Sequence, residues 1–209
     1  DAEIDVIGQM GAEFRCGVEV GKDVTLDELR RQGYKAFFVA IGLQGGRTAG
    51  VPGENAAGVE TGIDFLRRMN VDDTQKLTGR TVVIGGGNVA VDVARTALRA
   101  GSEAVTMLCL EGENEMPAAR DEVAEAKHEG ITVQNGWGPK EILTDNGKVT
   151  GVVFKKCVRV LDENHRFAPQ YDENDTITVP CENVLTAIGQ KALWGGLLEG
   201  AKAVLRGIG

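Results

Sequence analysis

The stretch from Arg80 to Glu111 constrains the fold most, because three adjacent glycines there separate two segments of different periodicity. Thr81–Ile84 is a short apolar, β-branched run, which is typical of a strand buried in a parallel sheet. It leads into Gly85-Gly86-Gly87-Asn88-Val89-Ala90, which matches the pattern G-x-G-x-x-A. Gly101 then follows a segment with one apolar helical face, formed by Ala90, Val93, Ala94, Ala97 and Leu98. The sequence predicts a strand, a tight glycine turn and a helix.

A second apolar run, Ala104–Leu110, follows this helix and ends at the acidic Glu111. An acid about 20 residues after such glycines can accept a hydrogen bond from a ribose hydroxyl, and the glycine turn can approach a pyrophosphate closely. We interpret residues 80–111 as a dinucleotide-binding βαβ unit. Two alternatives are a glycine turn that is only a close-packed corner, and a site for S-adenosylmethionine, which lacks the pyrophosphate that a helix N-terminus favours.

Composition and charge limit the class of protein. The 209 residues carry a net charge of −8, which argues against nucleic acid or an anionic membrane as a general partner. The sequence has no signal peptide and no apolar run of membrane length, so we expect a cytoplasmic protein. The cysteines form no close pair that would indicate a zinc site or a redox disulfide, and we expect Cys109 and Cys157 to be buried thiols.

The remaining segments predict an α/β fold. Thr25 and Glu28 form a capping box for a helix over residues 26–32, and a helix is expected from Thr61 to about Met69. Strands are expected over residues 13–20, 36–41, 131–134, 176–180 and 183–188. A helix is expected over residues 118–129, after Pro117.

Residues 139–160 differ in pattern from the alternating strands and helices before them. Here two strand-like segments, Lys140–Thr144 and Val149–Val160, flank the turn Asp145-Asn146-Gly147. This pattern predicts an antiparallel hairpin. The charged segment from Leu161 to Asp175 is expected to be an exposed loop, and the loop from Gln44 to Gly58, rich in glycine and proline, is expected to be a domain crossover.

Two predicted strands end in the same tripeptide, Ala40-Ile41-Gly42 and Ala187-Ile188-Gly189, which would place bare backbone where ligands of open α/β sheets bind. The layout of these two tripeptides with Pro52-Gly53-Glu54, the glycine turn and Glu115-Met116-Pro117 resembles that of certain flavoproteins. In those proteins a nicotinamide domain is inserted into a flavin domain. The chain is most similar to the small (beta) subunit of glutamate synthase and its relatives.

The resemblance implies a Rossmann-like three-layer fold with a parallel sheet and an antiparallel β element. Residues 1–50 would be part of the flavin domain, 51–188 the NAD(P)-binding domain, and 189–209 the return toward the flavin domain. In that family a reduced nicotinamide passes a hydride to FAD, and electrons continue to iron–sulfur centres of a larger subunit or a ferredoxin-type acceptor. The implied cofactor-binding residues are Gly85, Gly86, Gly87, Asn88, Val89, Ala90, Leu110, Glu111, Glu122, Ala187, Ile188 and Gly189. No catalytic side chain and no metal ligand is expected.

The sequence departs from the family at three places. Leu110 and Glu111 stand where the family usually has two arginines for the 2′-phosphate of NADPH, and a carboxylate repels that phosphate, so we expect NADH to be preferred. Arg120 is an alternative cation for the phosphate. The glycine motif of an FAD site and the cluster-binding cysteines are missing, so we expect the chain alone to hold little or no FAD and to transfer no electrons alone. A non-catalytic dinucleotide-binding or subunit-docking module is the main alternative function.

Overall fold

The computed structural model describes residues 2–72 and 74–199, which fall into two compact units. One unit takes in residues 2–42 and the described residues from Ala192 onward, and the other is Leu43–Lys191. The nicotinamide domain expected over residues 51–188 lies inside the second unit. None of the described helices is long and apolar enough to cross a membrane.

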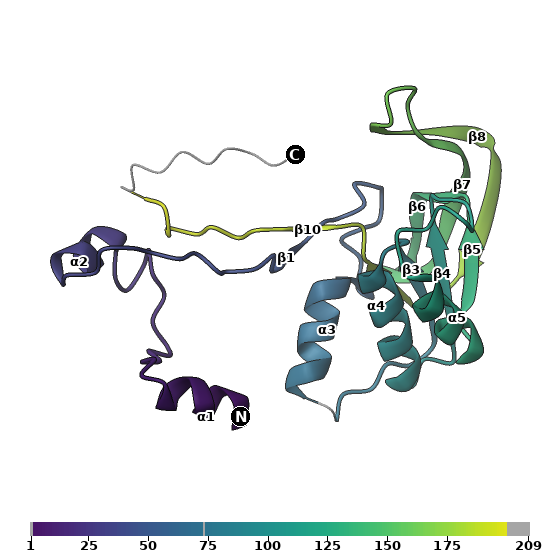
Figure 1. Ribbon diagram of the computed structural model, residues 1–209. Coiled ribbons are helices and arrows are strands. Elements are labelled where there is room, and N and C mark those ends of the chain that lie inside the picture. The colour runs from purple at the N-terminus through teal and green to yellow at the C-terminus, as the bar shows by residue number, and fades with distance from the viewer. Residues whose placement is uncertain (1, 73, 200–209) are drawn as a thin grey trace. The chain divides into compact units, whose positions relative to one another are not determined.

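A five-stranded parallel sheet forms the centre of the larger unit, in the order β2-β9-β3-β4-β5 (Figure 1). The strands are β2 (Val59–Thr61), β3 (Arg80–Ile84), β4 (Ala104–Cys109), β5 (Thr132–Asn135) and β9 (Asn183–Thr186). The predicted glycine turn therefore follows the central strand. Two short strands, β1 (Gly45–Gly46) and β10 (Gln190–Lys191), pair antiparallel beside this sheet.

Three helices pack on one face of the parallel sheet: α3 (Gly62–Val71), α4 (Asn88–Arg99) and α5 (Arg120–His128). An antiparallel sheet packs on the other face, made of β6 (Trp137–Asp145), β7 (Lys148–Leu161) and β8 (Phe167–Pro180) (Figure 1). Strand β3 shows how both faces are covered, because Val83 joins the core under the helices whereas Val82 and Ile84 join the core against the antiparallel sheet. The expected three-layer α/β arrangement is confirmed.

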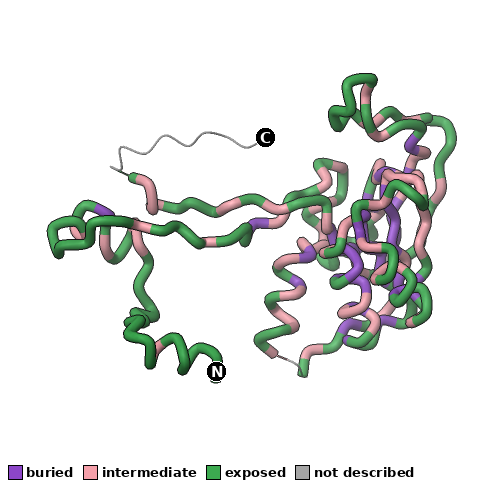
Figure 2. The backbone as a smooth tube through the Cα atoms, in the orientation of Figure 1, coloured by how far each residue is buried: buried purple, intermediate pink, exposed green. Residues whose placement is uncertain are grey.

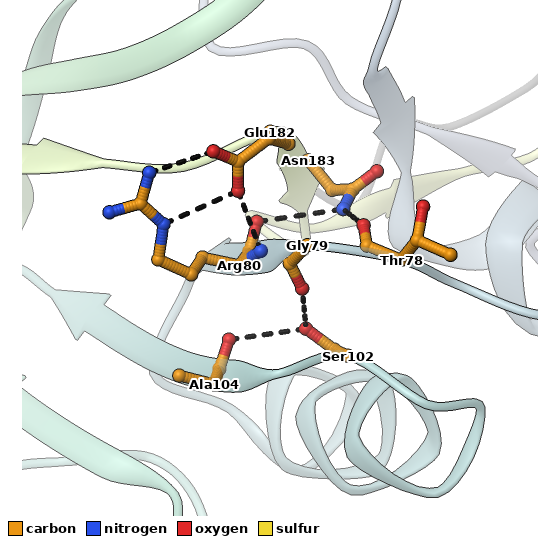
Figure 3. A network of polar contacts seen from close by, with 7 residues as sticks. All are labelled: Thr78, Gly79, Arg80, Ser102, Ala104, Glu182 and Asn183. Atoms are coloured by element: carbon orange, nitrogen blue, oxygen red, sulfur yellow. Dashed lines mark hydrogen bonds and ion pairs between the residues drawn. The ribbon is translucent and has the colours of Figure 1, made fainter.

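Polar contacts fix the amino ends of the central strands, at the sheet edge opposite the glycine turn (Figure 3). Arg80 at the start of β3 pairs with Glu182 before β9 at 2.7 Å. Asn183 Nδ2 donates to the Thr78 carbonyl at 2.8 Å. The Ser102 hydroxyl lies 2.8 Å from the Gly79 carbonyl. These contacts hold β3, β4 and β9 in register and leave the carboxyl ends open.

The smaller unit contains two helices, α1 (Ala2–Gln9) and α2 (Leu26–Arg31). The predicted capping box is present, with Thr25 and Glu28 exchanging hydrogen bonds. The predicted strands over residues 13–20 and 36–41 are wrong, because neither segment forms a β-ladder and residues 36–41 are largely exposed (Figure 2). An apolar run predicts burial, but a strand also needs a partner strand, and the first Ala-Ile-Gly tripeptide therefore closes no strand here.

The loop predicted over residues 161–175 is also wrong, because β8 begins at Phe167 and pairs with β7 along its length. The pairing has register shifts between Lys155 and Lys156, between Cys157 and Arg159, and between Arg159 and Leu161. At the first of these, Lys155 pairs with Thr176 and the next residue, Lys156, pairs with Asp172. Residues 173–175 therefore form a bulge, which explains part of the loop-like composition. The predicted hairpin turn is confirmed, with positive φ at Asn146 and Gly147 between β6 and β7.

Candidate cofactor-binding site

The glycine turn is built by close backbone contacts. Gly85 has φ +147°, and a Cβ placed there would collide with the carbonyl oxygen of Ala187 at the end of β9. A Cβ on Gly86 would lie 2.7 Å from the Glu111 carboxylate, whereas one on Gly87 would meet no atom within 4 Å. Gly85 thus needs glycine, Gly86 is tightly packed against the side chains of Glu111 and Cys109, and Gly87 leaves the turn open on the side where a ligand can approach.

Helix α4 presents its N-terminus at this turn. Gly87 is the N-cap residue, and it supplies no side-chain hydrogen bond to the first amides of the helix. The Asn88 side chain points to another partner, because its Oδ1 accepts a 2.8 Å hydrogen bond from the Ala119 amide. The Ala118 amide donates to the Gly86 carbonyl at 3.0 Å, so the segment before α5 is fixed to the glycine turn. Uncapped amides at a helix N-terminus are suited to an anion such as a phosphate.

A pocket of about 690 Å³ opens at this turn, within the larger unit. It lies at the carboxyl ends of β3, β4 and β9, where ligands of open α/β sheets bind. Most of the predicted site residues line it: Gly85, Gly86, Gly87, Asn88, Val89, Leu110, Glu111, Ala187, Ile188 and Gly189.

Two predicted residues do not line this pocket. Ala90 is fully buried in the core between α4 and the sheet, where its small side chain permits close packing. Glu122 lies in the first turn of α5, and its Oε2 atom is buried without a hydrogen-bond partner among the described residues. The alternative phosphate ligand Arg120 is exposed and is likewise absent from the lining.

Glu111 is held firmly at one end of the pocket. Its carbonyl accepts hydrogen bonds from the Gly136 amide at 3.1 Å and from Asn135 Nδ2 at 3.2 Å. Asn135 Nδ2 also lies 3.2 Å from the sulfur of Cys109. Burial, followed by the nearby charge of Glu111, raises the pKa of Cys109 to about 12, so this thiol is a neutral part of the pocket floor.

Arg47 stands at the other end of the pocket and was missed by sequence reasoning. Its amide donates to the Gly189 carbonyl at 3.2 Å, and its carbonyl accepts from Thr186 Oγ1 at 3.2 Å. Its side chain runs past Gly189, where an added Cβ would lie 3.4 Å from Arg47 Cδ. Arg47 and Glu111 are the charged residues among the described residues that line the pocket. The position of Arg47 depends on contacts across the fold, and no local motif indicates it.

Sequence reasoning also missed the wall formed by the antiparallel sheet. Trp137 and Pro139 of β6 line the pocket together with Phe167, Pro169 and Tyr171 of β8. The last three residues stand at every second position along β8, and all three line the pocket. This alternation was the available signal, but the charged residues around it led to the loop prediction.

The sequence pattern of the family described as "Pyridine nucleotide-disulphide oxidoreductase" matches residues 5–203. The NADP(+)-dependent formate dehydrogenase subunit beta of Moorella thermoacetica is 37% identical over 91% of this chain and 27% of that protein. The Glutamate synthase [NADPH] small chain of Escherichia coli is 33% identical over 88% of this chain and 42% of that protein. This chain therefore spans less than half of these relatives. The predicted resemblance to glutamate synthase small chains is confirmed.

Solved structures show the same fold. FprA of Mycobacterium tuberculosis in complex with NADPH has a TM-score of 0.70 at 20% identity, over 84% of this chain and 54% of that one. Thioredoxin reductase of Lactococcus lactis has a TM-score of 0.53 at 19% identity, over 75% and 45%. Because the family pattern covers nearly the whole sequence, the chain belongs to the pyridine nucleotide-disulphide oxidoreductase family.

Proposed function

We propose that this chain is the NAD(P)H-binding portion of a flavin-dependent oxidoreductase resembling the glutamate synthase small subunit. One observation carries the proposal: the glycine turn between β3 and α4 faces a pocket of about 690 Å³ with bare backbone and an uncapped helix N-terminus. A dinucleotide pyrophosphate matches this arrangement, because the amides of Asn88 and Val89 can donate to it.

In the proposed complex the dinucleotide lies across the carboxyl ends of the strands. The pyrophosphate at β3 lies between the end of β9 on one side and the end of β4 on the other. Glu111 follows β4, so the adenosine ribose lies on that side and the nicotinamide lies toward Ala187–Gly189. A reduced nicotinamide supplies a hydride that a flavin can accept, while the protein orients the two groups.

The proposal assigns NADH as the preferred nucleotide. The Glu111 carboxylate lies against Gly86 at the adenosine end, where it can accept a hydrogen bond from the ribose 2′-hydroxyl. The 2′-phosphate of NADPH would place like charges together. Relatives do not decide the choice, since the small chain above is named for NADPH whereas the PreT subunit of Escherichia coli, 33% identical over 92% of this chain, is named NAD-dependent.

Calorimetric titration with NADH and NADPH tests both parts of the proposal. We expect NADH to bind more tightly, and Glu111→Arg to weaken NADH by about tenfold and to improve NADPH, because a charge-assisted hydrogen bond is exchanged for attraction to the phosphate. Glu141→Arg is the matched control, since Glu141 is an exposed carboxylate of β6 outside the pocket. Equal affinities, or no shift in Glu111→Arg, would refute the nucleotide preference. Binding of S-adenosylmethionine without binding of NADH would refute the dinucleotide site itself.

The flavin and the electron acceptor are assigned to other parts of the assembly. Among the described residues, 2–42 and 192–199 contain no strand and hence no glycine turn of the strand–helix kind that holds a dinucleotide pyrophosphate. The named relatives are beta subunits and small chains, which supports a larger catalytic or iron–sulfur partner, or a ferredoxin-type acceptor. Absence of diaphorase activity in the full-length protein with FAD would favour the non-catalytic binding module.

A further inference from the structure

We propose that the apolar wall of the antiparallel sheet is the adenine-binding surface of the pocket. The wall consists of Trp137 and Pro139 of β6 and Phe167, Pro169 and Tyr171 of β8, all of which line the pocket. The inference deepens the proposed function and rests on it, because it names the part of the dinucleotide that this surface takes.

The wall is an apolar surface without a charged side chain. Phe167 is its most open residue, since it is 67% exposed and lines the pocket. Tyr171 adds a phenol that stays neutral, because burial raises its pKa. Such a surface suits a flat, neutral base rather than a phosphate or a ribose.

Neighbouring residues hold the rings in place. Tyr171 packs so closely on Gly138 that a Cβ there would collide with its ring. Lys155 Nζ lies 4.3 Å from the centroid of the Tyr171 ring, and Lys156 Nζ lies 4.7 Å from that of Trp137. A lysine covers one face of each ring, so the remaining face or edge meets the pocket. A ring that is already ordered loses little freedom when a base stacks on it.

The position of the wall matches the adenosine end. The glycine turn follows β3, Glu111 follows β4, and Trp137 follows β5, so these three points succeed one another along the sheet. The Glu111 carbonyl is bonded to the Gly136 amide, next to Trp137. A nucleotide with its pyrophosphate at the turn and its ribose at Glu111 therefore carries its base toward the wall, and away from Arg47 and Gly189.

Fluorescence titration of the full chain tests the inference. Trp194→Phe leaves Trp137 as the only tryptophan, since the sequence has two. In this parent we compare ADP-ribose, which carries adenine, with reduced nicotinamide mononucleotide, which does not. We expect ADP-ribose to change the Trp137 emission saturably, and Phe167→Ala or Tyr171→Leu to weaken ADP-ribose by about tenfold, the scale of one lost base–aromatic contact. Affinity for the mononucleotide, measured by calorimetry, is expected to stay unchanged.

Val158→Ala is the matched control, because Val158 is 68% exposed on β7 and does not line the pocket. It is expected to bind ADP-ribose like the parent, and melting curves establish that all variants are folded. If the parent binds NADH and ADP-ribose but both wall variants bind ADP-ribose equally well, the adenine surface is refuted and the dinucleotide site stands. Equal losses for ADP-ribose and the mononucleotide would also refute it. If the folded parent binds neither nucleotide, the proposed function fails and the adenine surface with it.

Discussion

Two glycines of the same turn, Gly85 and Gly87, are expected to differ sharply in their tolerance of alanine. At Gly85 an alanine would have φ +147°, and its Cβ would collide with the Ala187 carbonyl oxygen and lie 2.9 Å from the carbonyl carbon. This carbonyl cannot swing away freely, because the Ala187 amide is bonded to the Ile84 carbonyl at 2.7 Å. Backbone strain of about 1–3 kcal/mol and overpacking of a similar size give a loss of about 2–6 kcal/mol in the free energy of unfolding.

Gly87 is the matched control, because its φ is −93° and an added Cβ meets no atom within 4 Å. Gly87→Ala loses only the N-cap preference of glycine, which is worth less than about 1 kcal/mol. Thermal melting is then expected to fall by about 5–20 °C in Gly85→Ala and by at most a few degrees in Gly87→Ala. Equal shifts in the two variants, or a larger one at Gly87, would refute the packing argument for the turn.

Three further outcomes follow from charge and burial. Hydrogen bonds from Arg80 lower the pKa of Glu182, and the pair is half-exposed, so Glu182→Gln should lower the free energy of unfolding by less than about 1 kcal/mol at pH 7. Urea titrations should show this difference vanish as the pH falls below 4.5, the ordinary pKa of a glutamate. Cys16 is exposed while the other three thiols are buried, so Cys16→Ser should abolish rapid labelling by a thiol reagent under native conditions. Arg47→Gln removes a cation that lines the pocket, so it should weaken the binding of the anionic NADH by about tenfold at low salt. Calorimetry checks this affinity, and melting curves check that the melting temperature is unchanged.

The central sheet was predictable because its strands carry their own signal. Thr81–Ile84 is apolar on both faces, and the structure covers one face with helices and the other with the antiparallel sheet. Residues 36–41 are also apolar but form no ladder in the described part of the chain. The local sequence shows how apolar a segment is. A strand also requires a partner strand, and the local sequence does not indicate whether one is present.

The candidate site was predictable where a sequence motif contains it, as in the glycine turn with Glu111 and in the strand end Ala187-Ile188-Gly189. The glycine turn and Glu111 belong to a single βαβ unit with fixed spacing, and both line the pocket. Arg47 reaches the same pocket through contacts with Thr186 and Gly189, which are far away in the sequence. Such pairings arise from the tertiary fold, so no periodicity or spacing around Arg47 could have indicated them.

The bulge in β8 separates the part of the antiparallel sheet that packs on the core from the part that borders the pocket. On one side of residues 173–175, β7 contributes Val152 and Phe154 to the core against the parallel sheet. On the other side, β8 presents Phe167 and Tyr171 to the pocket. A regular strand would continue the same alternation, whereas unpaired residues bend the strand and change the side chains that face inward. Glu173 stabilises the bulge by pairing with Lys155 at 2.7 Å and Lys140 at 3.5 Å. The acidic segment that resembled a loop therefore lies where β8 passes from the part of the sheet that packs on the core to the part that borders the pocket.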